Sequence, residues 1–223
     1  MLLSEADHAA VTAAVAQAEL STDGEIVTVV ARQSDAYHDV ALHWAVLAML
    51  LGLAFLAWQP GILEWLHARL TNSWAETVSP SWYLTAALIL VTIKFLGVRL
   101  LLAIGALRMA LTPGTTKARR VQRKALQLFR TGAEKRTKAA TGVLLYLSLA
   151  EHRAEIIADE SIHSKVAPDV WGAAMAALLA KVKQGKPGEG MADAVAQIGV
   201  VLAEHFPRSE GDTNELPDRL IEL

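Results

Sequence analysis

The stretch Thr141–Asp159, TGVLLYLSLAEHRAEIIAD, decides the fold. Val143–Leu149 is an almost unbroken apolar run that is too short for a typical helix, and Arg153–Ala158 alternates in part between apolar and polar residues. We therefore predict two strands joined by an exposed turn that contains Glu151 and His152. A strand that is apolar on both faces is normally the buried centre of a sheet covered by helices on two sides. The stretch thus predicts an α/β domain with two helical layers.

A helix and another strand precede this hairpin. Ser4 and Asp7 have the spacing of a capping box, so we expect a helix from Ser4 to about Glu19. Small residues on one face predict close packing against a sheet; they are Ala6, Ala9, Ala13 and Ala16, followed by Leu20. After a turn at residues 21–24, Glu25–Ala31 (EIVTVVA) has the β-branched composition of a strand. Helix, turn and strand are the start of an α/β layer fold.

Two apolar segments interrupt this domain between residues 41 and 105. Ala41–Trp58 carries no formal charge and is near the shortest length that spans a bilayer, about 17 to 25 residues. The second segment runs from Trp82 to about Leu102 and contains Lys94 and Arg99. Either both cations snorkel toward one interface, or a functional charge lies within the membrane, where it costs several kcal/mol. We predict an inserted two-helix transmembrane hairpin.

The basic residues predict the orientation of this hairpin. Ten lysines and arginines lie between Arg108 and Lys138, whereas the loop at residues 59–80 contains only Arg69. An excess of Lys and Arg marks the cytoplasmic side, so the chain after the second span is expected in the cytoplasm. Two crossings return the chain to its starting side. Both termini and the α/β domain are therefore expected on the cytoplasmic side.

Thr116–Ala140 is expected to be a crossover helix that is apolar on one face and basic on the rest. Its apolar residues recur at helical spacing; they are Val121, Ala125, Leu128, Phe129 and Gly132. The basic face has three interpretations: contact with anionic lipid, at about 1 kcal/mol for each cation, a merely solvated surface, or a nucleic-acid patch. We favour the lipid bilayer as the partner, and not nucleic acid, because the helix follows a predicted span.

The C-terminal part predicts two more helices and a tail. The first begins at Ala167-Pro168-Asp169, with proline in its first turn. Gln184–Gly190 is expected to be a loop, and Met191–Phe206 has the clearest helical period. Residues 208–223 are polar and mostly acidic, so we expect a flexible tail. The α/β domain then comprises residues 1–35 and 115–207, with the hairpin at 41–105.

Several segments together resemble the TPM-domain family, which includes thylakoid-lumen proteins, photosystem II repair proteins and a nematode receptor auxiliary subunit. They are DGEIVTVV, GVLLYLSLAEHRAEIIAD, Trp171, GEGMADAVAQIG, HFP and TNELPD. The resemblance covers about residues 1–35 and 115–210, and the chain is similar to bacterial membrane-anchored members with an inserted hairpin. It implies an α/β/α sandwich in a multi-pass protein of the bacterial inner membrane. Some plant members are described as acid phosphatases, and some members bind calcium.

Four carboxylates are the candidate metal ligands. If the second strand is parallel to the first and the third is antiparallel to both, the start of the first strand and the end of the third meet at one edge. Asp23, Glu25, Asp159 and Glu160 then gather there. Carboxylate oxygens suit Ca²⁺ or Mg²⁺, whereas the alternative is ordinary turn chemistry and surface charge. At the opposite edge, Glu151 and His152 have the residue types of a general base pair, but turn residues are usually only solvated.

The sequence contains no convincing catalytic constellation. The chain has no cysteine, which excludes a thiol nucleophile and a disulfide framework, and it contains neither a nucleophile elbow nor an HExxH motif. We assign no catalytic residue. The expected function is a non-enzymatic, membrane-anchored interaction domain that assists the assembly or maintenance of a membrane-protein partner. The alternative is a metal-dependent phosphatase.

Overall fold

The computed structural model describes residues 2–71, 78–132, 141–210 and 214–223. The chain forms two compact units, one comprising Met1–Asp35 and Pro113–Leu223 and the other comprising Ala36–Thr112. The first unit is therefore discontinuous in sequence, and the second is inserted between its two parts. The first segment of the discontinuous unit ends at Asp35, and the inserted unit extends to Thr112.

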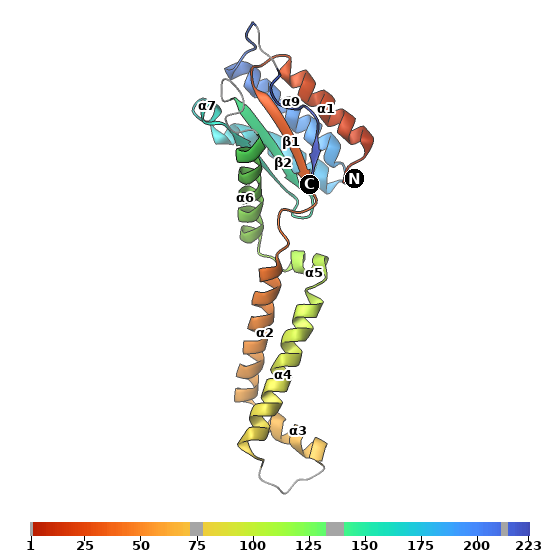
Figure 1. Ribbon diagram of the computed structural model, residues 1–223, viewed down its shortest axis with the longest axis vertical. Helices are drawn as coiled ribbons and strands as arrows, with labels where there is room; N and C mark the ends of the chain where they lie inside the picture. Colours follow the sequence, from red (N-terminus) through yellow and green to blue (C-terminus); the bar gives the residue numbers. More distant parts are fainter. Residues whose placement is uncertain (1, 72–77, 133–140, 211–213) are drawn as a thin grey trace. The chain divides into compact units, whose positions relative to one another are not determined.

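A mixed four-stranded sheet forms the centre of the first unit (Figure 1). The strands are β1 (Glu25–Ala31), β2 (Gly142–Ser148), β3 (Arg153–Ala158) and β4 (Ile221–Glu222), in the order β3-β2-β1-β4. β1 and β2 are parallel, with Glu25 opposite Gly142 and Ala31 opposite Ser148. β3 runs antiparallel to β2. The three strands and the directions expected from the sequence are confirmed, whereas β4 is not predicted by it.

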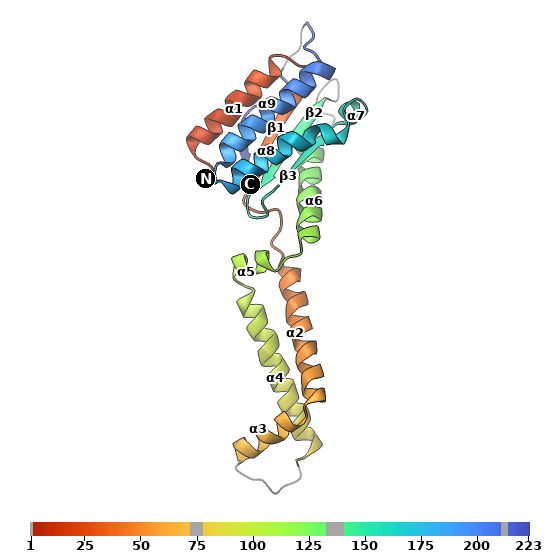
Figure 2. The same ribbon diagram turned by 180° about the vertical axis from the view of Figure 1, so that it is seen from behind.

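Three helices cover one face of this sheet, as Figure 2 shows. They are α1 (Glu5–Glu19), α8 (Gly172–Lys183) and α9 (Pro187–His205). Alternate residues of β1 and β2 point into this layer; they are Ile26, Val30, Val143, Leu145 and Leu147. The helices contribute mainly aliphatic side chains, including Val11, Val15, Leu178, Val195, Ile198 and Leu202. This is the larger of the two apolar cores of the domain.

Helix α6 (Gly114–Gly132) covers the opposite face. Its Val121, Ala125 and Phe129 are buried. They pack with the other side of the strands, at Val27, Val29, Ala31, Leu144 and Tyr146. Because helices lie on both faces, the predicted α/β/α sandwich is confirmed. Residues 133–140 of the expected helix Thr116–Ala140 lie outside the described residues.

The buried face of α1 is not the one expected from the sequence. The capping box is confirmed, since Ser4 Oγ accepts from the amide of Asp7 and the Asp7 carboxylate accepts from the amide of Ser4. The small residues at positions 6, 9, 13 and 16 and Leu20 are exposed. The buried residues are Val11, Val15 and Ala18. The larger valine side chains remove more apolar surface from water than alanines do, and this decides which face packs.

The C-terminal region contains more regular structure than predicted. The loop expected at Gln184–Gly190 is shorter, because α9 already begins at Pro187, where proline suits the first helical turn. A short helix α7 (Glu160–His163) follows β3, and a 3-10 turn (Pro168–Trp171) precedes α8. The tail expected to be flexible instead packs on the domain: Leu216 and Leu220 are buried, and the tail ends in β4.

The regular elements among the described residues of the inserted unit are all helices. They are α2 (His38–Trp58), α3 (Gly61–Thr71), α4 (Pro80–Leu101) and α5 (Gly105–Ala110), and α2 packs along α4. The imidazole of His67 contacts the indole of Trp82 edge-on, with ring centroids 4.8 Å apart, and so joins α3 to α4. By length and composition, α2 and α4 are long and apolar enough to cross a membrane.

Candidate functional site

The outer face of α6 carries the strongest concentration of positive charge among the described elements. The helix has one apolar face, which is buried against β2 and β3, so its cations lie on the remaining faces. Six lysines and arginines lie within its bounds; they are Lys117, Arg119, Arg120, Arg123, Lys124 and Arg130. The helix contains no acidic residue. The surface that it presents to solvent is therefore strongly basic.

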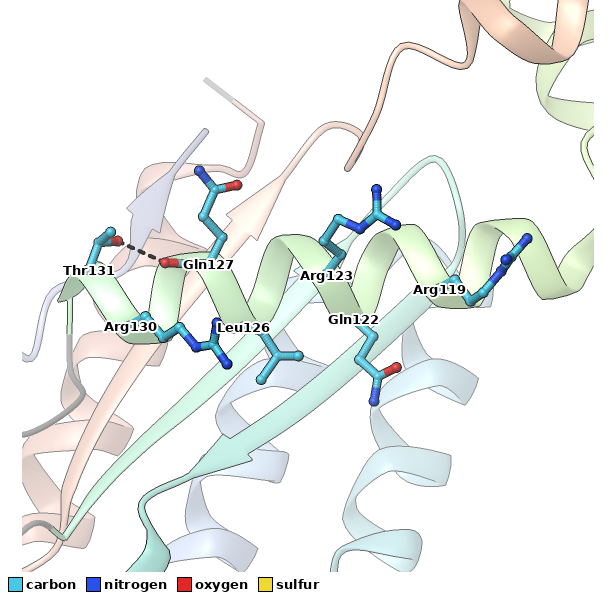
Figure 3. A pocket seen from close by; sticks show the side chains of 7 residues that line it. All are labelled: Arg119, Gln122, Arg123, Leu126, Gln127, Arg130 and Thr131. Atoms are coloured by element: carbon cyan, nitrogen blue, oxygen red, sulfur yellow. Dashed lines mark hydrogen bonds between the residues drawn. The ribbon is translucent and has the colours of Figure 1, made fainter.

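An open hollow of about 660 Å³ lies along this basic face. Its described lining residues all belong to α6; they are Arg119, Gln122, Arg123, Leu126, Gln127, Arg130 and Thr131. Figure 3 shows Arg123 and Gln127 on one flank of the helix and Gln122 and Arg130 on the other. The Thr131 hydroxyl donates to the main-chain oxygen of Gln127 at 3.0 Å, so it bonds back onto its own helix. We call this set the α6 hollow.

The α6 hollow has the chemistry of a receptor for anions. Guanidinium groups bind phosphate or carboxylate oxygens in a bidentate manner, and the amides of Gln122 and Gln127 add neutral donors. Its described lining contains no carboxylate and no histidine, hence no acid–base pair for catalysis. The residue types of this lining support binding of an anionic group.

Arg120 has a different role from the three arginines of the α6 hollow. Its Nη1 lies 2.7 Å from Oδ1 of Asp35, and its side chain is half-buried. Asp35 is the last residue of the first chain segment of the domain. This ion pair ties α6 to the end of that segment.

A polar network at the carboxyl ends of β1 and β2 supports the same region. The Glu151 carboxylate accepts from the amide of Ser34 at 2.9 Å and from the hydroxyl of Ser148. The hydroxyls of Ser34 and Tyr146 lie 2.9 Å apart. Burial raises the pKa of Tyr146, and the hydrogen bond with Ser34 opposes this shift. The network holds the chain after β1 against the β2–β3 turn.

The structure corrects the expectation of an exposed turn at Glu151. Glu151 is buried, because its carboxylate satisfies a main-chain amide and a buried hydroxyl. His152 is exposed and has a left-handed backbone with φ of 49°. The Glu151 carboxylate is engaged by Ser34 and Ser148, which gives it a structural role in this turn.

The four candidate metal ligands lie at one edge of the sheet, as the strand directions require. The start of β1 and the end of β3 flank the start of β2, and Asp159 is adjacent to Gly142. Glu25 and Asp159 are buried, Asp23 is half-buried and Glu160 is exposed. The topological argument from the sequence is thus correct about the edge.

Main-chain amides donate hydrogen bonds to three of these four carboxylates. The Glu25 oxygens accept from the amides of Glu215 and Leu216, both at 3.2 Å. Asp159 Oδ2 accepts from the amide of Gly142 at 3.0 Å, and Asp23 Oδ1 accepts from the amide of Ser209 at 2.7 Å. Among the described residues, no three Asp, Glu or His side chains form a group that could hold a metal ion. Three of the four carboxylates therefore already have main-chain amides as hydrogen-bond partners.

Sequence reasoning missed the residues that fasten the tail. The amides of residues 209, 215 and 216 reach Asp23 and Glu25 from nearly 190 positions away in the chain. Main-chain amides have no signature in a sequence, so these contacts have no local signal. The signal that was available lies in Leu216 and Leu220, two leucines spaced four apart in the tail.

The fold and the site together define a class of protein: an α/β/α domain interrupted by an apolar helical hairpin, with a basic helix on its surface. Residues 105–201 match the family model of the TPM domain. This part of the chain is therefore similar to the TPM domain. The match begins in α5 and ends in α9, so α1 and β1 lie outside it.

One solved structure has the same fold. The NMR structure of BA42 protein from the psychrophilic bacterium Bizionia argentinensis has a TM-score of 0.56 to this chain. The two sequences are 18% identical, and the alignment covers 99% of this chain and 95% of that one. No curated protein sequence matches the chain.

Proposed function

We propose that this TPM-domain protein is anchored in the bacterial inner membrane by α2 and α4, with its α/β domain and both termini in the cytoplasm. The apolar surface of the hairpin supports the anchor. On α4, the side chains of Leu84, Leu88 and Leu100 are 73%, 64% and 76% exposed. A leucine surface of this kind is unfavourable in water and favourable in lipid. The positive charge of α6 supports the orientation.

We further propose that the α/β domain is a non-enzymatic interaction module for assembly or maintenance of a membrane-protein partner. The α6 hollow carries this proposal, because it joins three arginines to two glutamines without a general acid or base. The chain enters α6 at Gly114, thirteen residues after α4 ends at Leu101. A helix so close in sequence to a span is held near lipid headgroups, and each cation near an anionic surface contributes about 1 kcal/mol.

The alternative, a metal-dependent phosphatase, needs a phosphate-binding group and a metal-activated nucleophile at the same place. The arginines lie on the outer face of α6, whereas the four carboxylates lie at the sheet edge, where three of them accept hydrogen bonds from main-chain amides. Purified full-length protein is therefore expected not to hydrolyse a generic phosphomonoester with Ca²⁺ or Mg²⁺. Turnover that disappears in Asp23→Ala or Asp159→Ala would establish the phosphatase instead.

The lipid contact of α6 is testable by arginine modification. Full-length protein in nanodiscs is treated with phenylglyoxal, and the rate at each arginine is read by mass spectrometry. Arg119, Arg123 and Arg130 should react more slowly in discs containing phosphatidylglycerol than in phosphatidylcholine discs. High salt should remove the difference, because it screens exposed charges.

Arg219 is an internal control that lies in the C-terminal tail, away from α6 in the sequence. Its rate should be independent of the lipid. Equal rates at the three α6 arginines in both kinds of disc would contradict the lipid contact. Reporter fusions at Ser73 and at the C-terminus test the topology; a C-terminus outside the cell would overturn it.

A further inference from the structure

Lys94 of α4 lies in contact with Gly52 of α2. A Cβ atom added to Gly52 would meet Lys94 Cδ at 3.2 Å and its Nζ at 3.7 Å. Gly52 is buried, while Lys94 is exposed. The Lys94 side chain thus extends from α4 onto α2. It lies over Gly52, which has no side chain to block it.

The ammonium of Lys94 lies well inside the length of the hairpin. At a rise of 1.5 Å per residue, Gly52 is about 21 Å from His38 and about 9 Å from Trp58 along α2. Along α4, Lys94 itself is about 21 Å from Pro80 and about 10 Å from Leu101. Counted on either helix, the charge therefore lies inside the helix, about 9 to 10 Å from the nearer end. At this level the side chain of Lys94 lies against α2 at Gly52.

Arg99 differs from Lys94 in this respect. It lies in the last turn of α4, two residues before the helix ends at Leu101. A cation in the last turn is next to the interface and also complements the C-terminal end of the helix dipole. Of the two cations of α4, Lys94 is therefore the one whose position is not explained by closeness to a helix end.

The hairpin itself offers no carboxylate at this depth. Lys94 has no ion-pair partner among the described residues. The sequence of α4 contains no acidic residue, and the only one in α2 is Asp39 in its first turn. Asp39 is about 20 Å along the helix from Gly52. A second copy of this hairpin therefore cannot supply a counter-charge at this level.

We propose that Lys94 is a docking point for a transmembrane helix of another protein that carries an Asp or Glu within its span. This inference rests on the proposed membrane insertion and names the chemistry of the partner. A cation inside the bilayer costs several kcal/mol, and a carboxylate at the same depth offsets that cost for both groups. Gly52 helps because it lets the lysine lie flat, so that a third helix can approach α2 and α4 closely.

The test uses a model partner in lipid vesicles. The chain has no cysteine, so one introduced cysteine can carry a single donor fluorophore in the full-length protein. Leu70→Cys places it at an exposed position of α3. The acceptor is on a synthetic transmembrane peptide of leucine and alanine with one central Glu. A matched peptide has Gln in place of Glu. Energy transfer measures association.

We expect the Glu peptide to associate more tightly than the Gln peptide with the otherwise unchanged protein. Lys94→Leu should raise the dissociation constant of the Glu peptide about fivefold, the size of a polar contact between transmembrane helices. Arg99→Leu is the matched control and should leave the preference for Glu intact. Lys94→Arg should retain part of it.

Resistance to carbonate extraction is measured on the same vesicles and separates the two proposals. Protein that is extracted is not inserted, which overturns both the anchor and this inference. Protein that stays inserted but shows equal transfer with the Glu and Gln peptides, or no loss in Lys94→Leu, overturns the docking point alone.

Discussion

The imidazole Nε2 of His8 lies 2.8 Å from Oε1 of Glu222, the penultimate residue of the chain. The same carboxylate accepts from the amides of Leu2 and Leu3 at distances between 2.9 and 3.0 Å. Glu222 belongs to β4, which pairs with β1 through Val30. One carboxylate thus fastens the last strand to the start of α1 and joins the two ends of the chain.

This contact predicts how the end of the domain responds to acid. The hydrogen bond with His8 and those from Leu2 and Leu3 lower the pKa of Glu222 to about 2. A carboxyl with a folded-state pKa below its unfolded value stabilises the fold above the unfolded value, near 4.3 for Glu, and this stabilisation is lost as pH falls toward the folded value. Hydrogen-exchange protection of the Leu3 and Leu223 amides, corrected for intrinsic rates, should therefore decrease between about pH 4 and pH 2.

Glu222→Gln is the matched variant for this measurement. It should show weaker protection at neutral pH and no further loss over the same acidic range. Glu210→Gln, in the same tail, should behave like the unchanged protein. A decrease that is identical in Glu222→Gln would show that another group controls the end of the domain.

The packing of α1 on α9 makes a prediction about a single glycine. A Cβ added at Gly199 would lie 2.6 Å from the Cβ of Ala18, closer than two such atoms approach in proteins. Gly199→Ala should therefore force the helices apart and lower the stability of the domain by about 1–2 kcal/mol, the usual cost of overpacking. Chemical denaturation of the full-length protein in detergent, followed by circular dichroism, measures the change.

Gly172→Ala is the control for Gly199→Ala. Gly172 is the first residue of α8, and nothing lies within 4 Å of a Cβ added there. Because alanine reduces the conformational freedom of the unfolded chain, this change should leave stability equal or raise it by roughly 0.4–1 kcal/mol. Equal losses in both variants would contradict the close approach of α1 and α9.

The central strands could be predicted from the sequence because they are apolar on both faces, as in Val143–Leu149. The buried face of α1 could not, because alanine stripes and valine pairs both fit a helical period, and only the partner helix α9 decides between them. β4 was missed for a related reason. Its two residues carry no strand pattern of their own, and they pair only because β1 presents a free edge.

The acidic edge of the sheet makes a third prediction, which concerns Glu25. This buried side chain accepts hydrogen bonds from the amides of Glu215 and Leu216. Glu25→Gln replaces one acceptor oxygen by a donor that faces an amide, so it should cost about 1–2 kcal/mol. Hydrogen exchange at the Leu216 amide should accelerate accordingly, because the tail loses its attachment.

Glu160→Gln is the matched control at the same edge, since Glu160 is an exposed residue at the start of α7. It should change stability by no more than about 0.5 kcal/mol. An equal effect of both substitutions would mean that the overall charge of the edge matters and the tail contact does not.

The candidate site was only partly predictable. Strand directions alone placed the four carboxylates at one edge, and this was correct. Whether such carboxylates bind a metal ion or amides depends on which segment reaches them, and here Ser209, Glu215 and Leu216 supply amides from the far end of the chain. The basic face of α6 was predictable from its period, whereas the pairing of Arg120 with Asp35 was not, because the two residues are 85 positions apart.

The last prediction concerns calcium at this edge. Ca²⁺ needs about six to eight oxygen ligands, and among the described residues no three acidic or histidine side chains are grouped to begin such a shell. Recruiting Asp159 would also leave the buried amide of Gly142 without its acceptor, at a cost of about 1–3 kcal/mol. We therefore expect no heat in calorimetric titration and no shift in melting temperature with millimolar Ca²⁺. Asp159→Asn should lower stability to the same extent with and without the ion. A saturable thermal shift that is abolished by Asp159→Asn would show that the tail amides yield to a cation, and would restore the metal site at Asp23, Glu25, Asp159 and Glu160.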